Sequence, residues 1–204
     1  MQMSPIRRED ADALARLHAR AFPSFFLSSL GVPFLRQFYL GFVGDPTAVT
    51  VVARDGGTPV GCVVGTIEPQ GFFTRLLRRR LVGFGVASAR AAITRPRSIH
   101  RLLRGLLYRG GADHAPTGGA LHSSICVDPA RRDIGLGADL ISRWSELPAS
   151  KGASTAYLTT DAIDNEAVNR FYQRAGWTIA GTASTPEGRS MHTYTVTLPT
   201  GASN

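Results

Sequence analysis

Two spacings of hydrophobic residues alternate along this chain, and together they predict a mixed α/β protein. Apolar residues recur every three or four positions between residues 7 and 21, which predicts an amphipathic helix that ends near Pro23. Pro33 suits the first turn of a second helix, whose apolar face continues to Phe42. β-branched runs predict strands over residues 3–6, 48–53, 60–67, 123–127, 157–160, 178–181 and 191–198.

Turn-forming residues separate these predicted strands and helices. Residues 54–59, with two glycines and a proline, predict the turn of an antiparallel hairpin between the second and third strands. Pro129 ends the strand over 123–127, because proline cannot donate to a sheet ladder. Residues 182–189 predict a turn before the final strand, and residues 199–204 a frayed tail.

A glycine-rich turn follows the strand over 123–127 and leads into a helix. The helix is predicted from the helical spacing of apolar residues between Leu136 and Trp144. Gly135 and Gly137 at its start let the backbone approach a ligand closely. The N–H groups of the first turn lack partners within the helix, and the helix dipole favours negative charge there. This stretch therefore predicts a phosphate or pyrophosphate site.

The turn matches neither of two common phosphate loops. A P-loop ends in Gly-Lys-Ser/Thr, and this tripeptide is absent from the chain. The dinucleotide fingerprint needs a third glycine, where this chain has Leu140, and its glycines follow the strand almost at once. Here seven residues separate Val127 from Gly135. Both nucleotide-binding loops are therefore disfavoured.

A second polar helix follows the strand over 157–160. Asn165, Asn169 and Tyr172 lie at i, i+4 and i+7, so they share one helical face. Gly176 is suited to end this helix. The sequence thus places an asparagine and a tyrosine two turns apart, about 30 residues after the glycine-rich turn.

These two motifs, in this order, resemble the signatures of the Gcn5-related N-acetyltransferases, the GNAT family. The resemblance is strong over residues 120–182, plausible over 1–67 and absent over 69–119. It implies one α/β domain over residues 1–204, with a mixed, mostly antiparallel sheet flanked by helices. It also implies an acetyl-CoA-dependent N-acyltransferase that transfers an acetyl group directly to a primary amine.

The resemblance assigns roles to individual residues. The strand over 123–127 offers backbone groups to the pantetheine amides, Asn165 holds the pantetheine arm and Tyr172 protonates the departing thiolate. The residues expected to contact acetyl-CoA are Ile125, Val127, Arg132, Asp133, Gly135, Leu136, Gly137, Ala138 and Asn165.

A protonated amine must lose a proton before it attacks, so a general base is expected. Glu68, directly after the strand over 60–67, is the first candidate. His122, Asp161 and a water molecule are alternatives, and each side chain also has a purely structural interpretation. A covalent route through Cys126 is disfavoured, because the sequence places no base beside it.

Residues 69–119 form an arginine-rich insertion. The part from Pro69 to Ala112 has ten arginines and neither Asp nor Glu, and its apolar spacing predicts two helices broken near residues 94–96. Three interpretations stay open: a solvated basic face on a helical cap, a binding surface for phosphates of the acceptor or of CoA, and a contact with an anionic membrane. Nucleic acid is not expected, because no stacking platform accompanies the charge.

Composition narrows the class further. The chain has 204 residues, 43% hydrophobic residues and a net charge of +8, which suits an anionic ligand such as CoA. No apolar run is long enough for a membrane helix, no secretory signal is evident, and Cys62 and Cys126 are expected to be buried thiols in the cytoplasm. No metal site is expected. The acceptor is expected to be a small-molecule amine, such as an amino sugar or another anionic metabolite. A catalytically silent acyl-CoA sensor is the alternative function. The protein is also expected to be able to form a homodimer.

Overall fold

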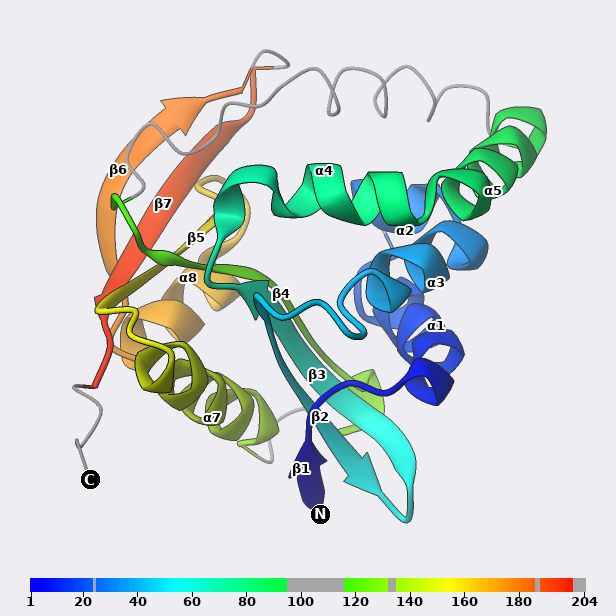
Figure 1. Cartoon of the computed structure of the whole chain (residues 1–204). Coiled ribbons are helices and arrows are strands. Elements are labelled where there is room, and N and C mark those ends of the chain that lie inside the picture. Colours follow the sequence, from blue (N-terminus) through cyan, green and yellow to red (C-terminus); the bar gives the residue numbers. More distant parts are fainter. Residues whose placement is uncertain (24, 95–115, 132–134, 186–187, 200–204) are drawn as a thin grey trace.

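A seven-stranded sheet runs through the computed structural model, which describes residues 1–23, 25–94, 116–131, 135–185 and 188–199 (Figure 1). The strand order is β1-β2-β3-β4-β5-β7-β6, and all neighbours are antiparallel except β4 and β5. The predicted mixed, mostly antiparallel sheet is therefore confirmed. The strands are β1 (Gln2–Ser4), β2 (Ala48–Asp55), β3 (Thr58–Thr66), β4 (Ala120–Val127), β5 (Thr155–Asp161), β6 (Thr178–Ser184) and β7 (Ser190–Thr197).

Helices cover both faces of this sheet, with α1 and α3 on one face and α7 and α8 on the other (Figure 1). The described helices are α1 (Ala11–Ala21), α2 (Phe26–Ser29), α3 (Val32–Leu40), α4 (Pro69–Arg79), α5 (Leu81–Thr94), α7 (Leu136–Ser150) and α8 (Glu166–Arg174), with short 3₁₀ turns at Arg8–Asp10 and Pro129–Arg131. The predicted helices over 7–21 and after Pro33 are confirmed, and so are those after the glycine-rich turn and around Tyr172.

The interior strands β2 and β3 are buried on both faces. Val52 and Cys62 belong to the core beneath α1 and α3, whereas their neighbours Val51 and Val63 belong to the core beneath α7 and α8. A strand buried on both faces needs an unbroken apolar run, and this is the pattern seen in both segments of the sequence.

The structure corrects the sequence prediction at β6. The strand was expected to end at residue 181, with residues 182–189 as a turn, but β6 continues to Ser184. Thr182 pairs with His192, and Ser184 pairs with Ser190. Small hydroxyl residues such as Thr182 and Ser184 favour a turn in a sequence-based prediction. In the structure, their pairing with β7 keeps them in an exposed edge strand. After β6, the N–H of Thr185 donates to the Arg189 carbonyl, and the N–H of Gly188 donates to the Thr185 carbonyl. At the N-terminus, β1 is likewise shifted to Gln2–Ser4.

The described part of the insertion contains a break that was not predicted. A single helix was expected to reach residue 94, but α4 ends and α5 begins on either side of Arg80. The N–H of Arg80 donates to the carbonyls of Leu76 and Leu77, which closes α4. The second predicted helix, up to residue 112, lies outside the described residues.

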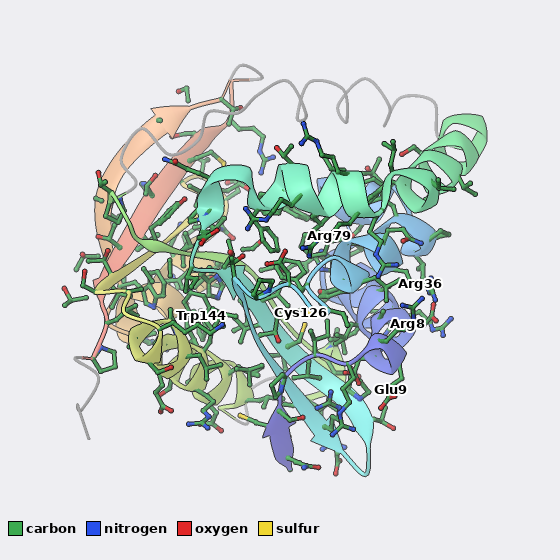
Figure 2. The ribbon with its side chains drawn as sticks, viewed as in Figure 1. Arg8, Glu9, Arg36, Arg79, Cys126 and Trp144 are labelled. Carbon is green, nitrogen blue, oxygen red and sulfur yellow. The ribbon has the colours of Figure 1, made fainter. Side chains whose placement is uncertain are left out.

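A buried carboxylate fastens α4 to the connection between α3 and β2. The Asp45 side chain is only 1% exposed; Arg79 donates to its Oδ2 over 2.9 Å, and Thr47 donates to its Oδ1 through both N–H and hydroxyl. Burial opposes ionisation of Asp45, but hydrogen bonds from Thr47 and the charges of Arg75 and Arg79 hold its pKa below the ordinary value. Figure 2 labels Arg79 at this junction. These two arginines therefore serve the fold.

A second buried ion pair anchors the N-terminal segment to β2. The side chains of Asp10 and Arg54 are each 4% exposed, and the Arg54 guanidinium donates to both Asp10 carboxylate oxygens. Arg54 also donates to the Pro5 carbonyl over 3.2 Å, and the N–H of Arg7 donates to Asp10 over 2.6 Å. The Asp10–Arg54 pair thus provides hydrogen-bond partners for the Pro5 carbonyl and the Arg7 N–H, where the chain leaves β1.

We predict that Asp10→Ala destabilises the protein by about 3–5 kcal/mol, because it leaves the Arg54 charge buried without its partner. Urea unfolding measures the effect. The matched control is Asp55→Ala, which breaks the exposed pair with Arg131 and should cost less than about 1 kcal/mol. Equal losses in the two variants would contradict a structural role for the buried pair.

Candidate active site

The parallel strands β4 and β5 pair only at their beginnings. Ala120 pairs with Ala156 and Leu121 pairs with Tyr157, and no later position of the two strands is paired. From His122 onward the two strands therefore diverge. The opening has a closed end at Leu121 and an open end at Val127.

A β-bulge explains why β4 leaves its neighbour. Val64 pairs with Ser124, but Gly65 pairs with His122, so Ser123 has no counterpart on β3. The extra residue bends the strand and increases its local twist. The bulge lies one residue past His122, where pairing to β5 stops. The bulge and the start of the opening therefore coincide.

The β4 backbone presents hydrogen-bonding groups to this opening. The N–H of Asp128 donates to the Val60 carbonyl over 2.8 Å, so Asp128 directs its backbone groups toward β3. Successive residues of a strand alternate sides, so Cys126 also faces β3. Ile125 and Val127 then direct their N–H and C=O groups toward the unpaired side. These are the two strand residues that the sequence predicts for pantetheine amides.

The first turn of α7 lies at the open end, where Leu136 comes close to Gly61, the partner of Val127. Gly135 is the residue before this helix, and its φ of 78° is favoured only by glycine. Gly137 allows close packing, because a Cβ there would lie 3.3 Å from the Phe171 ring on α8. The N–H groups of Leu136 and Gly137 have no acceptor within the helix, since the helix begins there. Ala138 donates its N–H to the Gly135 carbonyl, and the predicted contacts Arg132 and Asp133 lie outside the described residues.

Asn165 caps the beginning of α8 beside the end of β5. Its Nδ2 donates to Thr160 Oγ1 over 2.9 Å and to the Asp161 carbonyl over 3.0 Å. Both amide hydrogens are therefore engaged in holding the turn between β5 and α8. The carbonyl oxygen of the Asn165 side chain is the group left to accept a hydrogen bond from a ligand.

Tyr172 packs in an aromatic cluster at the closed end of the opening. The centroid of its ring lies 5.8 Å from the ring centroid of His122 on β4. The corresponding distances are 6.0 Å to Trp177 and 5.9 Å to Tyr194 on β7. A phenol is protonated at neutral pH, and burial raises the pKa of Tyr172 further above its ordinary value. A protonated, buried phenol can act as a general acid.

The three side chains considered as general base lie in different environments. Glu68 follows β3 and caps α4; its side chain is 60% exposed and lies 3.5 Å from Arg75. Asp161, at the end of β5, accepts three hydrogen bonds from the Arg189 guanidinium. His122 is buried, and burial lowers its pKa to about 4. A neutral imidazole with this pKa is a weak base at neutral pH.

Sequence analysis missed two contributions to this region. Tyr194 donates to Asn169 Oδ1 over 3.2 Å, and Trp144 donates from Nε1 to the Val49 carbonyl over 3.0 Å. Both bonds join residues far apart in the chain, so no local pattern reveals them. The bulge at Ser123 was also missed, because an extra strand residue has no signature in a single sequence.

Other features of the described residues do not bear on this region. A surface cavity of about 360 Å³ lies between the start of β5 and the end of β7, away from the diverging strands. Within the described ranges, no cluster of three or more metal-ligating side chains occurs. None of the described helices is long and apolar enough to cross a membrane.

The sequence matches a model of the acetyltransferase (GNAT) family over residues 11–177. A comparison with curated proteins gives no match. The match covers more than half of the chain and includes every predicted site residue, so the chain belongs to the GNAT family of acetyltransferases.

Solved structures share the fold at low sequence identity. An acetyltransferase assigned to the GNAT family from Desulfovibrio desulfuricans has a TM-score of 0.66 at 14% identity, over 97% of this chain and 99% of that one. An aminoglycoside 6'-N-acetyltransferase complexed with coenzyme A has a TM-score of 0.61 at 16% identity, over 98% of both chains. A ribosomal-protein alanine N-acetyltransferase from Escherichia coli has a TM-score of 0.59 at 14% identity, over 100% of this chain and 97% of that one.

Family membership identifies the enzyme class. The protein is an N-acetyltransferase, and acetyl-CoA is its acyl donor. The described residues fit this donor: a strand edge with unpaired backbone groups ends at a helix N-terminus that favours a pyrophosphate.

We predict that stability falls as the pH falls from 6.5 to 4, because His122 and His18 both have folded-state pKa values lowered to about 4 by burial. The unfolded chain takes up these protons first, so each histidine costs up to about 3 kcal/mol across this range. Urea unfolding at several pH values measures the slope. His122→Phe should remove about half of it, and an unchanged slope would contradict the assignment.

Proposed function

We propose that the protein acetylates a primary amine of a small-molecule acceptor, most specifically an amino sugar, at the opening between β4 and β5. The observation that carries the proposal is the end of β4–β5 pairing at Leu121, with Tyr172 at the closed end and the first turn of α7 at the open end. This order matches the order of groups along acetyl-CoA, from thioester to pyrophosphate.

Different residues of the chain bind different parts of acetyl-CoA, the acyl donor. Bound acetyl-CoA supplies an activated acetyl thioester. Ile125 and Val127 offer backbone hydrogen bonds along the opening, and Asn165 offers its side-chain oxygen from the β5 side. Leu136, Gly137 and the helix dipole of α7 favour the pyrophosphate.

Tyr172 acts as the general acid in this proposal. Its phenol is protonated at neutral pH, and its contact with His122 sets the ring beside the bulged part of β4. Donation of this proton to the sulfur as the C–S bond breaks lets CoA leave as a neutral thiol, a better leaving group than the thiolate.

Glu68 acts as the general base, through water. Thr66 pairs with Leu121, so Glu68 lies two residues beyond the closed end of the opening. Its backbone N–H donates to Thr66 Oγ1 over 3.1 Å, which fixes the start of the loop while the carboxylate stays exposed. An exposed carboxylate at this position can accept the proton of an incoming ammonium group.

The similar structures support an amino-sugar acceptor. Three of them are aminoglycoside 6'-acetyltransferases, with TM-scores of 0.62, 0.61 and 0.60 and identities of 18%, 16% and 16%. The insertion over 69–119 is proposed to cap the acceptor side within a single domain of residues 1–204. Arg75 and Arg79 are paired with Glu68 and Asp45, so they give an anionic acceptor little support.

A thiol-release assay with acetyl-CoA tests the function. The acceptor panel contains an aminoglycoside, a nucleotide-linked amino sugar, a peptide with N-terminal alanine and a polyamine. Release with one of the two sugars supports the proposal and separates a neutral or cationic sugar from an anionic one. Release only with the peptide or the polyamine would refute the acceptor class. Acetyl-CoA binding with no release from any amine would favour a catalytically silent acyl-CoA sensor.

We predict that Tyr172→Phe keeps acetyl-CoA affinity but lowers kcat at least about 100-fold, the usual range for a lost general acid. Isothermal titration and thiol release measure the two quantities. The matched control is Tyr157→Phe, another buried tyrosine whose pKa is raised by burial, and it should retain its activity. Unchanged turnover in the Tyr172 variant would remove it from the acid role.

We predict that Glu68→Gln lowers kcat/KM about 100-fold at pH 7 and much less at high pH, where the acceptor amine is already deprotonated. A pH–rate profile measures this recovery. Glu146→Gln is the control, because Glu146 is also an exposed carboxylate paired with an arginine, Arg143. A uniform loss across the pH range would assign Glu68 a structural role instead.

A further inference from the structure

Two thiols face each other directly behind the proposed acetyl-CoA strand. Cys62 on β3 and Cys126 on β4 are register partners, and their sulfur atoms are 3.4 Å apart. Both are free thiols, exposed by only 1% and 2%. They lie on the α1 and α3 face of the sheet, where Figure 2 labels Cys126.

A buried hydrogen-bond network surrounds these thiols. Tyr39 Oη lies 3.5 Å from the sulfur of Cys126 and 3.7 Å from that of Cys62. The same oxygen lies 2.9 Å from His18 Nδ1, and His18 Nε2 has no partner among the described residues. Hydrogen bonds from Cys62 and Tyr39 lower the pKa of Cys126, against the opposing effect of burial. Cys126 is therefore the thiol that ionises first.

We infer that Cys62 and Cys126 form a reversible disulfide that weakens acetyl-CoA binding. The part concerning acetyl-CoA rests on the proposed function, because it assumes that Ile125 and Val127 bind the donor. The disulfide itself rests only on the opposed positions of the two sulfurs.

Hydrogen peroxide is the oxidant in this chemistry. The Cys126 thiolate attacks one peroxide oxygen, the O–O bond breaks, and a sulfenic acid and hydroxide result. The Cys62 sulfur then displaces the sulfenic hydroxyl group and forms the S–S bond. The thiol protons leave with the oxygens as two molecules of water. Two thiols are oxidised and one peroxide is reduced, so atoms and electrons balance.

The register connects this bond to the donor site. Asp128 donates its N–H to its partner Val60, so the pair two residues earlier, Cys126 and Cys62, is also of the hydrogen-bonded type. In such pairs the Cβ atoms lie up to about 5.5 Å apart, whereas a disulfide needs Cβ atoms about 3.8 Å apart. Closing the bond draws β4 toward β3. Ile125 and Val127 flank Cys126, so their backbone groups move with it.

The test treats the full-length protein with hydrogen peroxide and measures its intact mass and its affinity for acetyl-CoA. The chain has only two cysteines, so a loss of two hydrogens without dimer formation identifies this disulfide. We expect acetyl-CoA to bind about tenfold more weakly after oxidation, which is the effect expected if two backbone hydrogen bonds to it are distorted. Reduction by dithiothreitol should restore the affinity. Cys62→Ala, with Cys126→Ala as a second variant, should show neither the mass change nor the affinity change.

Linkage supplies an independent readout. If the disulfide weakens acetyl-CoA binding, saturating acetyl-CoA must disfavour the disulfide by the same factor, so it should shift the redox equilibrium toward the thiols. A folded protein that never loses the two hydrogens, under conditions where the urea-unfolded chain does, would overturn the inference. A disulfide with unchanged acetyl-CoA affinity would overturn its regulatory part. If the reduced protein does not bind acetyl-CoA at all, the proposed function fails, whereas the mass result still decides the disulfide.

Discussion

The early end of pairing between β4 and β5 is the constraint on which the rest of this structure depends. Among the described residues, strand pairing between the β1–β4 part of the sheet and the β5–β7–β6 part is limited to two register positions, at Ala120 and Leu121. Half-buried backbone groups that lose their ladder partners must find others, in water or in a ligand. The opening is therefore costly for stability, and it is also what makes the strand edge available to bind a ligand.

The aromatic cluster under the opening compensates for the missing ladder. Trp144 on α7 donates to a β2 carbonyl and touches His122 on β4. Tyr172 on α8 touches His122 on one side and Tyr194 of β7 on the other. These contacts tie together the two parts of the sheet that the strands themselves barely join. Tyr172 is thus part of the packing, which explains why its side chain is buried.

Local signals in the sequence were sufficient for much of this architecture. Gly135 and Gly176 mark helix ends through conformations that only glycine adopts easily, and both have positive φ. The polar face of Asn165, Asn169 and Tyr172 follows from helical spacing alone. The bulge at Ser123, the extension of β6 and the partners of the insertion's arginines could not be predicted. Each depends on which distant segment lies alongside, and a single sequence does not contain that information.

Several of the described arginines have acidic partners within the fold. Among the described arginines, Arg54 neutralises Asp10, Arg189 neutralises Asp161, and Arg75 and Arg79 share Asp45 and Glu68. These described arginines stabilise the fold, whereas one-to-one ion pairing leaves the net charge of +8 unchanged. Besides Arg132, which lies outside the described residues, the predicted pyrophosphate site offers backbone N–H groups and a helix dipole, which carry no formal charge.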